Sequence, residues 1–135
     1  FKRAGCVRVD TICQLFDCAL SLSMQPRPKG NRLAIVTNAG GPGVLATDSL
    51  TAKGGQLAKL SDETILKISK ALSPYWSHGN PVDVLGDASP EQYCAAIQAC
   101  LECENVDGVL TVLTVQTMTD AVGTAKCLVK LGKAA

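Results

Sequence analysis

The stretch Leu33-Ala-Ile-Val-Thr-Asn-Ala-Gly-Gly-Pro-Gly43 decides how the rest of the chain is interpreted. Its first five residues are apolar or β-branched without polar alternation, which predicts a strand buried on both faces. The glycine-rich turn that follows leads into a helical pattern that ends near Gly54-Gly55. A buried strand that passes through a tight turn into a helix is typical of an α/β protein.

Strand and helix patterns alternate along the remaining sequence. The predicted strands lie at 33–37, 56–60, 82–85 and 109–113. The residues expected to cap helices are Asp10, Ser61, Ser89 and Asp120. In the helix after Ser89, the side chains expected to point into the core are those of Tyr93, Ile97, Cys100 and Leu101. The alternation predicts a three-layer, flavodoxin-like (Rossmann-like) parallel sheet of about four strands with helices on both faces.

Size and charge narrow the possible functions. The 135 residues are enough for one domain, and 47% hydrophobic with 19% charged residues indicates a compact fold. The net charge of +1 comes without a basic stripe, which argues against nucleic acid and anionic membranes as partners. The apolar runs are too short to span a bilayer. Because the chain opens on Phe1 without an initiator Met or a signal peptide, we expect a cytoplasmic piece of a longer polypeptide.

Seven cysteines are expected to be small buried thiols in a reducing cytosol. They stand at positions 6, 13, 18, 94, 100, 103 and 127. The pair Cys100-Leu-Glu-Cys103 lacks the second pair that a zinc site needs, so no metal site is predicted. A redox role is disfavoured because the pair lies near a helix C-terminus, where the dipole raises thiol pKa values.

Ligands of parallel α/β sheets bind at the carboxyl ends of the strands, and three polar loops are expected there. In the first loop, the candidate phosphate-binding residues are Asn38, Gly40, Gly41, Gly43 and Val44. Successive backbone N–H groups at a helix start favour an anion. The alternative is a tight turn that needs glycine dihedral angles. The spacing matches neither a dinucleotide fingerprint nor a P-loop.

The other two loops supply Asn80, Asp83 and Gln116 as a possible edge of the site. An Asx turn at Asn80 is the alternative explanation for that amide and carboxylate. His78, the single histidine, could act as a general base or carry a phosphoryl group. A solvated loop histidine is favoured, because no nucleophile motif accompanies it.

Taken together, these motifs resemble the NDP-forming acyl-CoA synthetases, which include ADP-forming acetate–CoA ligase and its relatives in the succinyl-CoA synthetase superfamily. The resemblance rests on five segments: 4–11, 15–17, 28–48, 80–87 and 113–120. It covers essentially the whole chain, and the run from Ile35 to Asp48 is highly specific. Val115, where the family often has Pro, is a small departure.

The resemblance implies a modular enzyme. Residues 1–30 would be an entry helix and Pro-rich connector from a preceding domain, and residues 31–135 a second flavodoxin-like, CoA-ligase domain, truncated before its last strands. The reaction would be acyl-CoA + ADP + phosphate ⇌ carboxylate + CoA + ATP, through a phosphohistidine held between two helix N-termini. The helix opening at Gly41 to Val44 would be one of them.

The resemblance also implies what this chain lacks. The phosphorylated histidine would lie upstream of Phe1, so no catalytic residue is assigned here. CoA, ADP or ATP, phosphate and Mg would serve the whole enzyme, with no cofactor bound by this piece alone. The partners would be the CoA-binding, phosphohistidine-loop and ATP-grasp modules. The alternatives are the ligase-like regulatory region of a protein lysine acetyltransferase and a non-catalytic interaction module.

Overall fold

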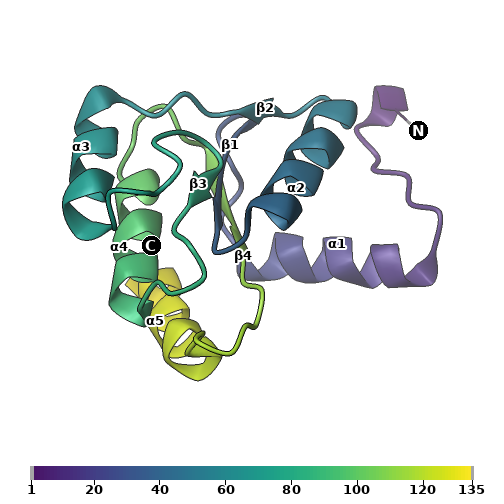
Figure 1. The fold of residues 1–135 in the computed structure, drawn as a ribbon. Coiled ribbons are helices and arrows are strands. Elements are labelled where there is room, and N and C mark those ends of the chain that lie inside the picture. Colours follow the sequence, from purple (N-terminus) through teal and green to yellow (C-terminus); the bar gives the residue numbers. More distant parts are fainter. Residues whose placement is uncertain (1, 135) are drawn as a thin grey trace.

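The computed structural model describes residues 2–134, in which helices lie on both faces of a parallel sheet. The α-helices are α1 (Ile12–Met24), α2 (Gly40–Ala52), α3 (Asp62–Ala71), α4 (Pro90–Leu101) and α5 (Ala121–Ala134), after a short 3-10 helix at Lys2–Ala4. The strands are β1 (Arg32–Thr37), β2 (Gln56–Leu57), β3 (Val82–Asp83) and β4 (Gly108–Val112). Figure 1 shows α3, α4 and α5 on one side of the sheet and α2 on the other. The predicted flavodoxin-like fold is confirmed.

Strand β1 is the centre of the sheet. It pairs with β4 along one edge, from Leu33 opposite Gly108 to Thr37 opposite Val112. The other edge of β1 is shared by two short strands, β2 beside its start and β3 beside its end. All three pairings are parallel, so the carboxyl ends of β1, β3 and β4 meet at one edge of the molecule.

Between β2 and β3, the side chain of Asn80 takes the place of strand backbone. Its Oδ1 accepts the N–H of Ile35 at 2.9 Å, and its Nδ2 donates to the carbonyls of Leu33 and Ala58, both at 2.9 Å. The predicted strands 56–60 and 82–85 are therefore shorter than expected, because a side-chain amide occupies the edge of β1 between them.

The main core lies between the sheet and helices α3 to α5. Ala34 and Val36 of β1 pack there among buried side chains that include Ile68, Trp76, Val82, Tyr93 and Ile97. The hydroxyl of Tyr93 lies within hydrogen-bond distance of the carbonyls of Val36 and Val112, and so ties β1 to β4. Tyr93, Ile97 and Cys100 point inward as predicted, but Leu101 is 46% exposed. The prediction for Leu101 is wrong, because this last residue of α4 faces a cavity at the amino edge of the sheet.

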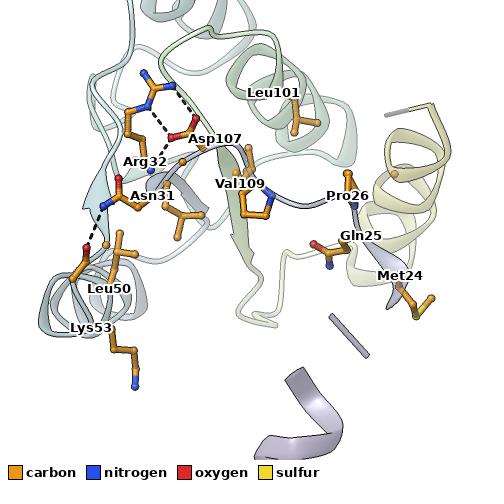
Figure 2. Close-up of a pocket in the computed structure, with 17 residues that line it drawn as sticks. Met24, Gln25, Pro26, Asn31, Arg32, Leu50, Lys53, Leu101, Asp107 and Val109 are labelled. Atoms are coloured by element: carbon orange, nitrogen blue, oxygen red, sulfur yellow. Dashed lines mark hydrogen bonds and ion pairs between the residues drawn. The ribbon is translucent and has the colours of Figure 1, made fainter. Parts of the chain in front are cut away.

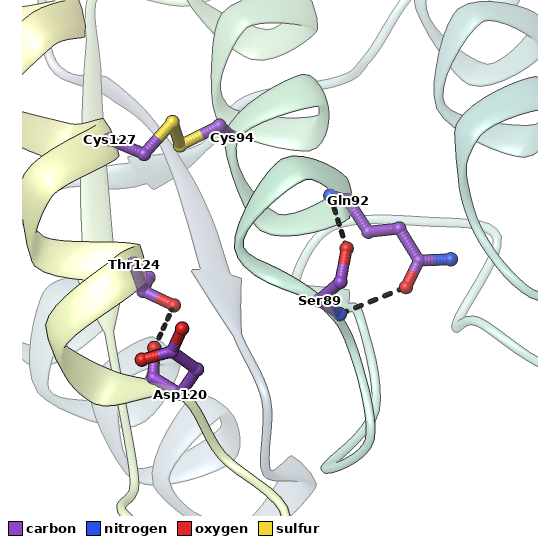
Figure 3. The surroundings of a disulfide bond; sticks show 6 residues. All are labelled: Ser89, Gln92, Cys94, Asp120, Thr124 and Cys127. Carbon is purple, nitrogen blue, oxygen red and sulfur yellow. Dashed lines mark hydrogen bonds between the residues drawn. A yellow bond between two sulfur atoms is a disulfide. The ribbon is translucent and has the colours of Figure 1, made fainter.

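The helix caps follow local sequence. Ser61 and Ser89 cap α3 and α4 as predicted, Ser89 in a reciprocal capping box with Gln92 (Figure 3). Asp120 accepts the N–H of Gly123 at the start of α5. At α1 the cap is Thr11, not the predicted Asp10, because Gln14 completes a second capping box with Thr11.

Helix α1 lies apart from the layered body, as Figure 1 shows. No residue of α1 is buried, and its large apolar side chains are all more than half exposed: Ile12, Leu15, Phe16, Leu20, Leu22 and Met24. Within residues 2–134, no helix has the length and apolar character needed to cross a membrane.

The expectation that the cysteines are buried thiols is wrong for five of the seven. Cys94 of α4 and Cys127 of α5 form a disulfide, with their Cα atoms 6.4 Å apart (Figure 3). Cys6 and Cys13 are exposed and Cys18 is half-buried, and no residue of α1 is buried. Cys100 and Cys103 are buried free thiols, and burial raises the pKa of Cys100 to about 12.

Candidate functional site

The candidate site lies where β1 passes into α2. Ala39 is the N-cap residue, in extended conformation, and no side chain caps the helix. Gly43 donates its N–H to Ala39 at 3.3 Å, and Pro42 has no N–H. Gly40 and Gly41 therefore carry backbone N–H groups that have no hydrogen-bond partner among the described residues. Val44 is the fifth helical residue, and helical geometry directs its N–H back to Gly40.

One glycine of this turn, Gly43, is needed for space. None of the three glycines is among the residues with positive φ, so the alternative of a turn that needs glycine dihedral angles is wrong. A Cβ on Gly43 would come within 3.0 Å of Thr37 Cγ2 and 3.5 Å of Pro81. The absence of a side chain at Gly43 therefore allows α2 to approach the sheet closely here. A Cβ on Gly41 would meet no atom within 4 Å. The surface over Gly41 is therefore open.

Asn38 joins the glycine turn to the loop that follows β4. Its buried side chain accepts the N–H of Thr114 at 2.8 Å and donates to the carbonyl of the same residue at 2.8 Å. Gln116 donates through Nε2 to the carbonyl of Asn38 at 3.3 Å. Both amides thus hold the two loops together. Sequence reasoning missed Thr114, and no local signal marks it, because its partner is 76 residues away.

Asp83 comes closest to the start of α2. A Cβ on Gly40 would lie 3.3 Å from Asp83 Oδ2, while Asp83 Oδ1 accepts the N–H of Leu85 at 3.0 Å. Asn80, by contrast, is fully engaged with the sheet edge. Of the residues predicted at the site edge, the structure brings Asp83 and Gln116 beside the glycine turn and leaves Asn80 in a structural position.

His78 lies outside this cluster. It is exposed, and its Nε2 is 2.9 Å from the carbonyl of Pro74. Its ring lies 4.8 Å from that of buried Trp76. This is the environment of a solvated loop histidine. Elsewhere in residues 2–134, no three His, Cys, Asp or Glu side chains come together as a metal site.

A cavity of about 770 Å³ opens at the opposite, amino-terminal edge of the sheet (Figure 2). Its wall includes Pro26 of the connector, Leu50 of α2 and Val109 of β4. Arg32 and Asp107 form a 2.8 Å ion pair at its rim. Hydrogen bonds from Arg32 lower the pKa of Asp107 to about 2. Sequence reasoning did not predict this cavity, because segments distant in the chain enclose it.

The fold and its open helix start define an α/β domain of flavodoxin type whose polar loops meet at the carboxyl edge of the sheet. The family model of the Ligase-CoA domain matches residues 33–134, and the chain belongs to this family. The resemblance inferred from the sequence motifs is thereby confirmed.

Two curated relatives are ADP-forming ligases. Acetate–CoA ligase I of Archaeoglobus fulgidus is 43% identical over 129 residues, which are 96% of this chain and 18% of that protein. The 4-hydroxybutyrate–CoA ligase of Nitrosopumilus maritimus is 34% identical over 134 residues, or 98% of this chain and 19% of that protein.

A solved structure is similar over nearly the whole chain. It is the acetyl-coenzyme A synthetase 1 of Ca. Korarchaeum cryptofilum in complex with phosphate and ADP. Its TM-score is 0.92 at 33% identity, covering 99% of this chain and 29% of that one. The chain thus spans less than a third of the length of each of these relatives.

Proposed function

We propose that this chain is one domain of an ADP-forming acyl-CoA ligase, which converts acyl-CoA, ADP and phosphate into carboxylate, CoA and ATP. The names of the two curated relatives support this reaction, and phosphate and ADP are the ligands of the solved relative. The whole enzyme would use CoA, ADP or ATP, phosphate and Mg. Other modules of the same ligase would bind CoA, carry the phosphorylated histidine and grasp the nucleotide.

The role proposed for this domain is to stabilise a phosphohistidine presented by another part of the enzyme. The observation that carries the proposal is the pair of unpartnered N–H groups at Gly40 and Gly41, at the start of a 13-residue helix. The helix dipole adds positive potential there. Each hydrogen bond from such a donor to a phosphoryl oxygen is worth about 1.5–3 kcal/mol.

Asn38 and Gln116 would act by positioning this helix start. Their amides fix the turn against the loop after β4, so the two donors are already oriented before a phosphoryl group arrives. Donors that are fixed in advance stabilise developing charge without reorganisation at the moment of reaction.

Residues 1–30 are proposed to belong to the preceding domain of the ligase. Within the chain, the apolar residues of α1 contact no core, although Phe16 and Leu20 recur at helical spacing. An amphipathic helix of this kind gains stability by burying its apolar side against another surface. Deleting residues 1–24 should therefore leave the thermal unfolding of the remaining chain nearly unchanged.

The function is tested with Gly41→Val in the full-length protein. A Cβ at this position meets no atom within 4 Å outside its chain neighbours and its own helix backbone, so the packing of the domain should survive while the phosphoryl group is kept away. Thermal unfolding checks that valine before Pro42 leaves the turn folded. Phosphohistidine formation from ATP, followed with radiolabelled γ-phosphate, should fall about 10- to 100-fold, which corresponds to the loss of one such hydrogen bond. CoA affinity should be unchanged.

Gly132→Val in α5 is the matched control, because a Cβ on this helical glycine also meets no atom within 4 Å. It should leave phosphohistidine formation intact. A folded Gly41→Val enzyme that is phosphorylated at the wild-type rate and level would contradict the proposed role of the turn.

A further inference from the structure

The loops at the carboxyl edge around α2 offer an anion two backbone donors but no lysine or arginine. The loops 38–44, 77–89 and 113–120 contain neither Lys nor Arg, but they contain the carboxylates Asp83, Asp87 and Asp120. None of these carboxylates takes part in an ion pair within residues 2–134. A site for a fully charged oxyanion normally adds positive side chains to its backbone donors. The composition of this edge is therefore unusual for a general anion site.

Asp83 is the carboxylate that an anion at the helix start would meet. Its Oδ2 lies against Gly40, 3.3 Å from where a Cβ would stand. Its Oδ1 is held by the N–H of Leu85. The backbone N–H of Asp83 donates to Ser77 Oγ at 2.9 Å, which fixes the residue from the other side. Oδ2 is thus a fixed acceptor beside two fixed donors.

The two donors and this acceptor distinguish between oxyanions. Sulfate at neutral pH presents acceptor oxygens alone, so it would satisfy the N–H groups of Gly40 and Gly41 while setting an oxygen against Asp83. A phosphoryl group that carries a proton can donate an O–H to the carboxylate and still accept from both glycines. An ionised acceptor makes that O–H hydrogen bond short and strong.

We propose that Asp83 makes the helix start selective for a protonated phosphoryl group over a fully deprotonated oxyanion of the same shape. This rests on the proposed function and adds the charge state of its ligand. Selectivity arises because a deprotonated oxyanion sets one of its acceptor oxygens against the carboxylate of Asp83, whereas a protonated phosphoryl group donates a hydrogen bond to that carboxylate.

The test compares inorganic phosphate with sulfate on the full-length protein near pH 6.5, where much of the phosphate carries two protons. Binding of radiolabelled phosphate is measured by equilibrium dialysis, and the part lost in Gly41→Val is assigned to this site. Sulfate should displace that part about tenfold less effectively than unlabelled phosphate, the effect of one hydrogen bond. In Asp83→Asn the two competitors should become nearly equal, because the amide can donate to sulfate.

Asp87→Asn is the matched control, since it removes an exposed carboxylate from the same loop without touching the Gly40 neighbour. It should keep the wild-type preference for phosphate. The inference alone is overturned by equal competition in the wild type, by a preference that persists in Asp83→Asn, or by its loss in Asp87→Asn. Absence of any phosphate binding that depends on Gly41 would overturn the proposed function as well. Thermal unfolding of each variant confirms that the comparison is made on folded protein.

Discussion

Replacing Asn80 with Ala should be among the most destabilising single changes in this chain. The side chain makes three hydrogen bonds of 2.9 Å, to the N–H of Ile35 and to the carbonyls of Leu33 and Ala58. Ile35 and Ala58 are buried, so water does not readily replace the lost amide. An unsatisfied buried backbone group costs about 1–3 kcal/mol. If one of the three groups finds a water, the two that remain unsatisfied cost about 2–6 kcal/mol, a large share of the roughly 5–15 kcal/mol typical of a domain.

The assay is urea unfolding of the chain, followed by circular dichroism and tryptophan fluorescence, since the single Trp76 is buried. Asn80→Asp should also destabilise, because it keeps an acceptor for Ile35 but sets a carboxylate oxygen against two carbonyls. The control is Asn105→Ala, at an exposed position, which should change stability by less than about 0.5 kcal/mol. A loss below about 1 kcal/mol for Asn80→Ala, with an unchanged denaturant slope, would refute the role of this amide as part of the sheet edge.

Three further predictions concern charge, packing and the lone histidine. The ion pair lowers the pKa of Asp107 to about 2, so its contribution to stability is present above the unfolded pKa near 3.8 and is lost as the pH falls toward 2. The difference in unfolding free energy between the wild type and Asp107→Asn should shrink over that window, and a difference independent of pH would contradict this. Gly43→Ala should lower the unfolding free energy by about 1–2 kcal/mol, because the new Cβ would press on Thr37. Gly41→Ala, which has no such neighbour, should change the unfolding free energy by less than about 0.5 kcal/mol. Equal effects of the two variants in thermal unfolding would refute the packing argument. His78→Ala in the full-length protein should leave phosphohistidine formation unchanged, since this histidine is exposed and lies outside the site. Disappearance of the phosphorylated species in that folded variant would show that His78 takes part.

The sequence by itself determined the order of elements and most of their ends. A buried strand, a helix cap and a glycine turn each depend on interactions within a few residues, as in the reciprocal bonds of Ser89 and Gln92. The same local patterns carried the resemblance to the acyl-CoA synthetases and located the turn at Gly40 and Gly41. Local information was misleading where two residues compete for one role, as at Asp10 and Thr11, or where α1 has an amphipathic pattern without a surface to cover.

Tertiary structure alone decided what each polar residue of the edge does. Asn80 and Asp83 are three residues apart and both polar, yet one completes the sheet and the other faces the helix start. Likewise, the disulfide between Cys94 and Cys127 spans 33 residues, and Asn38 bonds a residue 76 positions away. Partners at such separations are chosen by the packing of helices and strands into layers, and no local propensity encodes that choice.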